Sequence, residues 1–131
     1  MENFEFYAPT RMIFGKGTHL QVGKLIREYG FKKVLVHFGG GSVKKSGLLD
    51  QIQTSLKAEG IAYVLFGGVQ ANPVLSMARE GIALCRKENV DFVLAVGGGS
   101  VIDSSKCIAD GAGNPDMDVW KFHMKLSLIH L

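Results

Sequence analysis

Two Gly-Gly-Gly-Ser segments stand in this chain, at residues 39–42 and 97–100, and each directly follows a short apolar run. Such runs are typical of strands buried in a parallel sheet. Glycines at the carboxyl end of a strand let a ligand come close to the backbone. Because open α/β sheets bind ligands at that edge, the two turns predict two contacts with one extended anionic ligand, such as a dinucleotide.

The segment 97–103, Gly-Gly-Gly-Ser-Val-Ile-Asp, is the strongest candidate for phosphate binding. A helix that begins there offers free N–H groups and the positive end of its dipole to a pyrophosphate. Ser100 either caps this helix or donates its hydroxyl to a phosphate oxygen. Asp103 stands where an acid completes a capping box, and the alternative is that it points toward the cofactor. The segment does not match the GxGxxG dinucleotide pattern, and the chain lacks the P-loop pattern GxxxxGK[ST].

Strand and helix patterns alternate along the chain and must position these segments. The predicted strands cover residues 12–14, 33–38, 61–66 and 92–96. The centres of the last three lie about 30 residues apart, which is typical of βαβ units. The predicted helices run from a Thr18 cap to about Tyr29, from a Ser46 cap to Gly60, from Asn72 to about Glu88, and onward from near Ser100. This order predicts an α/β fold with a Rossmann-like parallel sheet flanked by helices on both faces.

The bulk composition limits the classes of function. A chain of 131 residues with 47% hydrophobic residues is expected to form one globular domain. The net charge of +3 is small and its basic residues occur only in pairs, which argues against nucleic acid as a partner. No apolar run is long enough to span a membrane. The acidic N-terminus and the lack of a CxxC pattern predict a cytoplasmic protein in which Cys85 and Cys107 are buried, reduced thiols.

Three motifs in order resemble the iron-containing (group III) alcohol dehydrogenases. They are the opening segment 6–17, the segment Gly-Gly-Val-Gln-Ala-Asn-Pro at 67–73, and Gly-Gly-Gly-Ser-Val-Ile-Asp-Ser-Ser-Lys at 97–106. The resemblance covers residues 4–122 and is strongest to the branch of butanol dehydrogenases and NADPH-dependent aldehyde reductases. It implies the fold shared with dehydroquinate synthase, and the reversible oxidation of small primary alcohols to aldehydes with NAD(P) and a metal, usually iron or zinc.

The resemblance also implies roles for particular residues. The pyrophosphate would lie against Gly98, Gly99 and Ser100, with Asp103 beside the nicotinamide and Asn72 lining the cleft. The adenosine ribose would meet the first glycine turn and the residues after it, namely Gly39, Gly40, Ser42 and Lys45.

The first glycine turn also bears on the choice of cofactor. NAD sites commonly place an acid at the ribose 2′-hydroxyl, and this turn has none. Instead it is followed by Lys44 and Lys45, which favours the 2′-phosphate of NADP, with NAD as the alternative. The competing interpretation is that both lysines are ordinary surface residues.

The sequence departs from the family in the part that is expected to bind the metal. The family holds its metal with an aspartate and histidines on a following helical domain, which is missing from this sequence. We therefore expect an NAD(P)-binding domain at 1–122, a divergent tail at 123–131, and neither catalytic nor metal residues. His19 is predicted to be exposed and His37 to be a hydrogen-bonded core residue. His123 and His130 would share one helix face, but two ligands do not complete a metal site.

Three functions follow from this reading. The first is the cofactor-binding part of a metal-dependent alcohol dehydrogenase, itself inactive on alcohols. The second is a kinase-type domain that binds nucleotide phosphates, although the missing P-loop weighs against it. The third is a non-catalytic interaction domain with the apolar segment 120–131 as its docking edge. Under the first function, a domain without its partner domain exposes apolar surface, which predicts association into a homo-oligomer.

Overall fold

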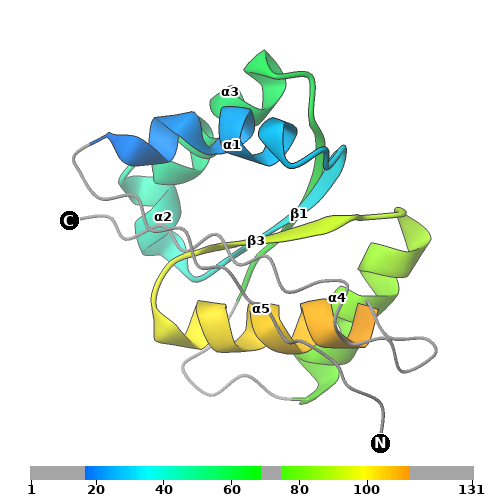
Figure 1. Cartoon of the computed structure of the whole chain (residues 1–131). Helices are drawn as coiled ribbons and strands as arrows, with labels where there is room; N and C mark the ends of the chain where they lie inside the picture. The colour runs from blue at the N-terminus through cyan, green and yellow to red at the C-terminus, as the bar shows by residue number, and fades with distance from the viewer. Residues whose placement is uncertain (1–16, 69–74, 113–131) are drawn as a thin grey trace, which may run out of the picture.

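The computed structural model describes residues 17–68 and 75–112, which form a three-stranded parallel sheet with helices on both faces (Figure 1). The strands are β1 (Lys33–Phe38), β2 (Ala62–Phe66) and β3 (Phe92–Val96), in the order β2-β1-β3. The predicted parallel α/β sheet is confirmed, and two of its strands have the predicted bounds. The predicted strand at 12–14 and the tail at 123–131 lie outside the described residues.

The helices form one layer on each face of the sheet (Figure 1). One layer contains the 3-10 helix η1 (Thr18–Gln21), α1 (Val22–Glu28) and α3 (Leu48–Ala58), with the short helix α2 (Gly41–Lys45) next to α3. The other layer contains α4 (Leu75–Lys87) and α5 (Gly99–Ala112), which pack against each other. The layers bury the central strand β1 almost completely, as its continuous apolar run requires, whereas the edge strand β2 leaves Leu65 40% exposed.

Alternate side chains of the central strand β1 pack against the two opposite helix layers. Val34 and Val36 belong to the core beneath α1 and α3, whereas Leu35 packs with Cys85 of α4 and Ile108 of α5. All three β1 residues have no exposed surface. Burying one such aliphatic side chain contributes about 1.5–3 kcal/mol, so β1 anchors both cores.

The predicted helix caps are wrong at two positions. Thr18 is the first residue of η1, and the residue before it, Gly17, adopts a left-handed conformation with φ 80°. Likewise Gly47, with φ 77°, precedes α3 in place of Ser46. The Ser46 hydroxyl donates a hydrogen bond to the Val43 carbonyl (3.2 Å) and accepts one from the Leu48 N–H (3.4 Å), but the N-cap position is occupied by Gly47. In both cases a glycine in the left-handed region turns the chain into the helix, which a hydroxyl residue does poorly.

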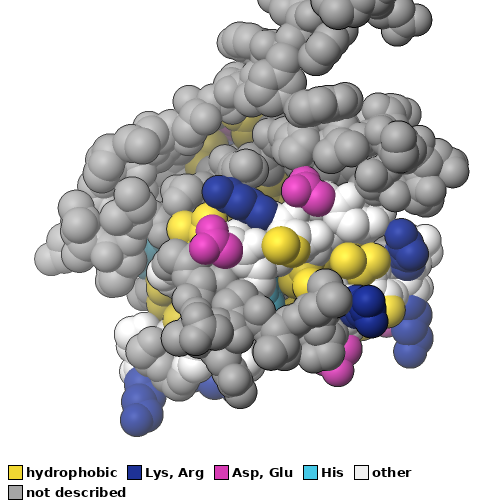
Figure 2. Space-filling model, turned by 90° about the horizontal axis from the view of Figure 1, so that it is seen from below, with side chains coloured by type: hydrophobic (Ala, Val, Ile, Leu, Met, Phe, Trp, Pro, Cys, Tyr) yellow, Lys and Arg dark blue, Asp and Glu magenta, His cyan; other side chains and the backbone are white. Residues whose placement is uncertain are grey.

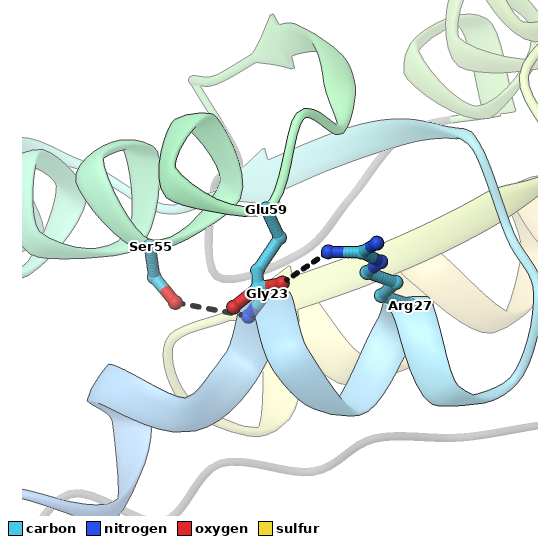
Figure 3. Close-up of polar contacts among 4 residues, drawn as sticks. All are labelled: Gly23, Arg27, Ser55 and Glu59. Carbon is cyan, nitrogen blue, oxygen red and sulfur yellow. Dashed lines mark hydrogen bonds and ion pairs between the residues drawn. The ribbon is translucent and has the colours of Figure 1, made fainter.

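Helices α1 and α3 lie in close contact through backbone as well as side chains (Figure 3). The Gly23 N–H donates to the Ser55 hydroxyl (2.9 Å), which in turn donates to the Leu20 carbonyl (2.8 Å). One turn further along, Arg27 and Glu59 form an ion pair of 3.0 Å. A Cβ atom at Gly23 would overlap the Ser55 carbonyl oxygen, so this approach requires glycine.

Two other predictions about side chains need correction. His19 is buried rather than exposed, because its Nε2 makes a 2.6 Å hydrogen bond with the Gln51 side chain of α3. Cys85 is buried as predicted, but Cys107 is exposed on α5.

The described surface mixes charged and apolar side chains. Figure 2, which looks onto the molecule from below, shows Lys or Arg and Asp or Glu side chains scattered among apolar ones. Across the described residues, every helix is too short or too polar to cross a bilayer. A cytoplasmic location and association into a homo-oligomer stay predictions.

Candidate functional site

All three strands are followed by glycine at the same edge of the sheet. β1 is followed by Gly39 and Gly40, β2 by Gly67 and Gly68, and β3 by Gly97 and Gly98. The parallel register pairs Phe38 with Val96 and His37 with Phe66, so the three ends lie side by side. The prediction that the two triglycine turns share one edge is confirmed, and the turn after β2 joins them there.

The strand order makes this edge a switch point. From β1 the chain moves through α3 to β2 on one side, and then crosses back through α4 to β3 on the other side. This reversal places α3 and α4 on opposite faces, as right-handed crossovers require. In such sheets ligands bind outside the carboxyl ends of the strands where the direction reverses, here between β1 and β3.

One side chain of α5 lies against both triglycine turns. A Cβ atom added at Gly39 would lie 3.4 Å from Cγ2 of Val101, and one added at Gly97 only 2.8 Å from the same atom. Gly97 also has φ 146°, a conformation that favours glycine. These glycines therefore let the first turn of α5 pack between the ends of β1 and β3.

Other glycines at the edge leave open space instead. No heavy atom lies within 4 Å of a Cβ position at Gly40, Gly68 or Gly98. All three glycines are exposed. A bulky anionic group can approach the backbone at these points without a steric clash, which fits the phosphates of a dinucleotide.

The first turn of α5 differs from the predicted cap. The helix begins at Gly99, and the Ile102 N–H donates to the Gly98 carbonyl (3.1 Å). Ser100 therefore lies inside the helix, and the capping box between Ser100 and Asp103 is wrong. Asp103 is exposed, so its proposed place beside the nicotinamide stays a prediction.

Two cations lie near the end of β1. Lys44 and Lys45 form the last turn of α2, and both are exposed. The Lys44 ammonium lies 5.5 Å from the centroid of the Phe38 ring, a cation–π contact typically worth about 0.5–1 kcal/mol at an exposed site. The Phe38 ring itself covers Gly67, where any Cβ atom would overlap it. This stack holds Lys44 close to the glycine turns.

The predicted site residues divide into three groups. The sheet edge brings together Gly39, Gly40 and Gly98, with Gly99 opening α5 beside them. Ser42 and Lys45 lie in α2, which follows the first turn directly. Asn72 lies outside the described residues.

Sequence reasoning missed several neighbours of the edge, namely Phe38, Gly67, Gly68 and Val101. The Gly-Gly pair after the strand at 61–66 was a readable signal for a third glycine turn. The positions of Phe38 and Val101 depend on how α5 and β2 dock, which has no local sequence signal.

A buried histidine lies below the edge. His37 has no exposed surface, and its Nδ1 lies 2.8 Å from the Phe66 carbonyl oxygen and its Nε2 2.7 Å from the Ser104 hydroxyl. The prediction of a hydrogen-bonded core histidine is confirmed. Burial lowers the pKa of His37, and the hydrogen bond to Phe66 opposes this only in part. The imidazole is therefore neutral at pH 7 and donates from Nδ1 to the carbonyl.

The described residues do not fit a catalytic metal. Within 17–68 and 75–112, His, Cys, Asp and Glu side chains form no group of three or more that could hold an ion. Burial raises the pKa of the Cys85 thiol to about 11, so it stays protonated and is a poor ligand. His123 and His130 lie outside this part of the chain.

Comparison with known proteins agrees with the geometry of the edge. The sequence profile of iron-containing alcohol dehydrogenases matches residues 9–130. A probable NADH-dependent butanol dehydrogenase of Bacillus subtilis is 50% identical over 125 residues, which cover 95% of this chain and 32% of that protein. The NADPH-dependent aldehyde reductase YqhD of Escherichia coli is 43% identical over 121 residues, covering 92% of this chain and 30% of the reductase.

Solved structures show the same relationship. The crystal structure of NADH-dependent butanol dehydrogenase A from Thermotoga maritima superposes with a TM-score of 0.80 at 48% identity. The match covers 92% of this chain and 30% of that one, so the chain spans about a third of the length of these relatives. The resemblance seen in the motifs is thereby confirmed, and the chain belongs to the iron-containing alcohol dehydrogenase family.

Proposed function

We propose that this chain binds the dinucleotide of an NAD(P)-dependent alcohol dehydrogenase that interconverts small primary alcohols and aldehydes. The observation that carries the proposal is the pairing of two triglycine turns at the switch point between β1 and β3. The names of the relatives, butanol dehydrogenases and an aldehyde reductase, support the substrate class. Because the chain spans about a third of their length, the alcohol reaction is proposed only for a protein of their full length.

The pyrophosphate is placed at the end of β3 in this proposal. Gly98 is open and exposed, and α5 is a helix of 14 residues that begins at the next position. Its free N–H groups and dipole favour an anion there. Gly98, Gly99 and Ser100 would then hold the phosphates, and Asp103 and Asn72 would lie toward the nicotinamide. The cofactor, when bound, would accept a hydride from the alcohol in its oxidised form or donate one to the aldehyde in its reduced form.

The adenosine ribose is placed at the end of β1, near Gly39, Gly40, Ser42 and Lys45. This assigns the adenosine ribose and the pyrophosphate of one cofactor to the neighbouring strands β1 and β3. Within residues 17–68 and 75–112, no three His, Cys, Asp or Glu side chains are grouped to hold a metal, so we expect this chain alone to bind the cofactor without oxidising 1-butanol.

Titration of reduced nicotinamide fluorescence tests cofactor binding directly. Adding the chain to NADPH or NADH should raise the emission and saturate, because the nicotinamide moves from water into a protein environment. ATP with Mg²⁺ serves as the comparison ligand. Absence of a saturable change with both dinucleotides would contradict the proposal, and binding of ATP alone would favour the kinase-type alternative.

We further propose that NADPH is preferred over NADH. The turn after β1 carries no acid, and Lys44 is held beside it against Phe38. The relatives include proteins named for each cofactor, so this preference rests on the residues of this chain.

Gly39→Asp tests this preference. The carboxylate should repel the 2′-phosphate and lower the affinity for NADPH about 10-fold relative to NADH, equivalent to about 1.4 kcal/mol. Gly39→Ala is the matched control, since it meets the same Val101 contact without charge. An unchanged ratio of the two dissociation constants in Gly39→Asp would count against the assignment of NADP.

A further inference from the structure

His37 connects three elements below the glycine edge. It lies on β1, two residues before Gly39. Its Nδ1 bonds the carbonyl of Phe66, the last residue of β2 before Gly67, and its ring stacks on the Phe66 ring with centroids 5.1 Å apart. Its Nε2 bonds the hydroxyl of Ser104 on α5. One buried imidazole thus joins the glycine turns after β1 and β2 to the helix α5.

Ser104 extends this connection to the first turn of α5. Its hydroxyl lies 3.2 Å from the carbonyl oxygen of Val101, and only 2% of Ser104 is exposed. Val101 is the residue whose side chain lies against both Gly39 and Gly97. The hydroxyl has one proton, which goes to Nε2 of His37, so the carbonyl of Val101 lies close to the hydroxyl without a second full hydrogen bond. Ser104 thereby ties α5 to β1 one turn after Val101.

We propose that His37 and Ser104 act as a positioning pair, which fixes the first turn of α5 against the ends of β1 and β3 and so sets the affinity for the dinucleotide. The second part of this inference rests on the proposed function. Neither side chain touches the edge where the cofactor is placed, since both are buried. They act through Val101 and through the N-terminal turn of the helix that would hold the pyrophosphate.

Hydrogen-bond chemistry explains why this pair can hold the helix firmly. The neutral imidazole donates from Nδ1 to the Phe66 carbonyl, which leaves Nε2 as an acceptor for the Ser104 hydroxyl. Both bonds are buried, where hydrogen bonds are stronger and where a lost partner is not replaced by water. Removing the hydroxyl leaves Nε2 buried without this donor, so α5 loses its polar link to β1.

The neighbouring serine provides a matched control. Ser105 is also buried on α5, with 6% of its surface exposed, but its hydroxyl has no hydrogen-bond partner in the described part of the chain. Ser104→Ala and Ser105→Ala thus remove the same atom from adjacent buried positions. Only the first removes a link to β1.

The experiment measures amide hydrogen exchange in the ligand-free 131-residue chain. Ser104→Ala should speed exchange of the Ile102 amide, which bonds the Gly98 carbonyl, about 10-fold or more, whereas Ser105→Ala should leave it unchanged. Ser55→Ala, which weakens contacts of α1 and α3 on the other face, controls for a general loss of stability. Ser104→Cys, with a weaker donor of similar size, serves as a second variant should Ser104→Ala not fold, and should give a smaller increase.

Two further readouts separate positioning from simple structural support. The ¹⁵N resonance of His37 Nε2 should shift in Ser104→Ala and not in Ser105→Ala. If the wild-type chain binds NADPH, Ser104→Ala should raise its dissociation constant about 5-fold or more, with Ser55→Ala close to wild type.

The outcomes distinguish this inference from the proposed function. Equal exchange in the Ser104 and Ser105 variants would overturn the positioning pair, whatever the chain binds. Faster exchange at Ile102 in a chain that binds no dinucleotide would support the pair and contradict the proposed function. Faster exchange together with unchanged NADPH affinity would overturn the proposed effect on binding.

Discussion

Replacing Gly23 with alanine is expected to lower the free energy of unfolding by about 3 kcal/mol or more. The new Cβ atom would overlap the carbonyl oxygen of Ser55, so backbone meets backbone and no side-chain rotation relieves the clash. Moving α1 away from α3 would also break the bond from the Gly23 N–H to the Ser55 hydroxyl (Figure 3). Urea unfolding followed by circular dichroism measures the loss.

Gly40→Ala is the control for this substitution. Gly40 has a negative φ, and no heavy atom lies within 4 Å of its Cβ position. Its free energy of unfolding should stay within about 0.5 kcal/mol of the wild type or rise slightly, because alanine restricts the unfolded chain. Equal unfolding midpoints for the Gly23 and Gly40 variants would show that α1 and α3 do not pack as described.

Gly98→Glu is expected to lower the affinity for NADPH and NADH about 100-fold, equivalent to about 2.7 kcal/mol. The position is open and exposed, so the free protein should fold as before. The carboxylate would, however, lie beside the N-terminus of α5, where the proposal places the pyrophosphate. Two like charges about 4–5 Å apart repel by several kcal/mol at the dielectric typical of a protein surface. Fluorescence titration measures the change.

Gly98→Gln separates charge from size in this test. The amide side chain has nearly the same shape, and it should cost less than about 10-fold in affinity. The difference between the two variants should shrink as the salt concentration rises, because exposed charges are screened. If both variants bind the dinucleotide equally well, the pyrophosphate does not lie at Gly98.

The strands were predictable because their signal is local. Residues 33–38 and 92–96 are short runs rich in aliphatic residues, each followed by glycine, and both have the predicted bounds. The helix starts were less predictable. Thr18 and Ser46 have good capping side chains, but the left-handed conformations of Gly17 and Gly47 decide where the helices begin. Backbone conformation of a glycine cannot be inferred from its neighbours alone.

In the candidate site, contacts between residues far apart in the sequence were also not predictable. The shared edge followed from parallel strands, each ending in glycine. The bond between His37 and Ser104 joins residues 67 positions apart, and it forms only because β1, β2 and α5 dock in one particular register. His19 was misassigned for the same reason, since its partner Gln51 lies 32 residues away. Such contacts depend on tertiary packing, which no periodicity in the sequence encodes.

The position of Val101 limits which substitutions this chain can accept at the edge of the sheet. One isopropyl group limits the volume available at two turns that are far apart in the chain, Gly39 and Gly97. A larger residue at Gly39 is therefore tolerated best when residue 101 becomes smaller, and such a change also relaxes the steric limit at Gly97, although not its backbone preference. We therefore expect substitutions at these three sites to be epistatic, and their effects should be measured in combination rather than one at a time.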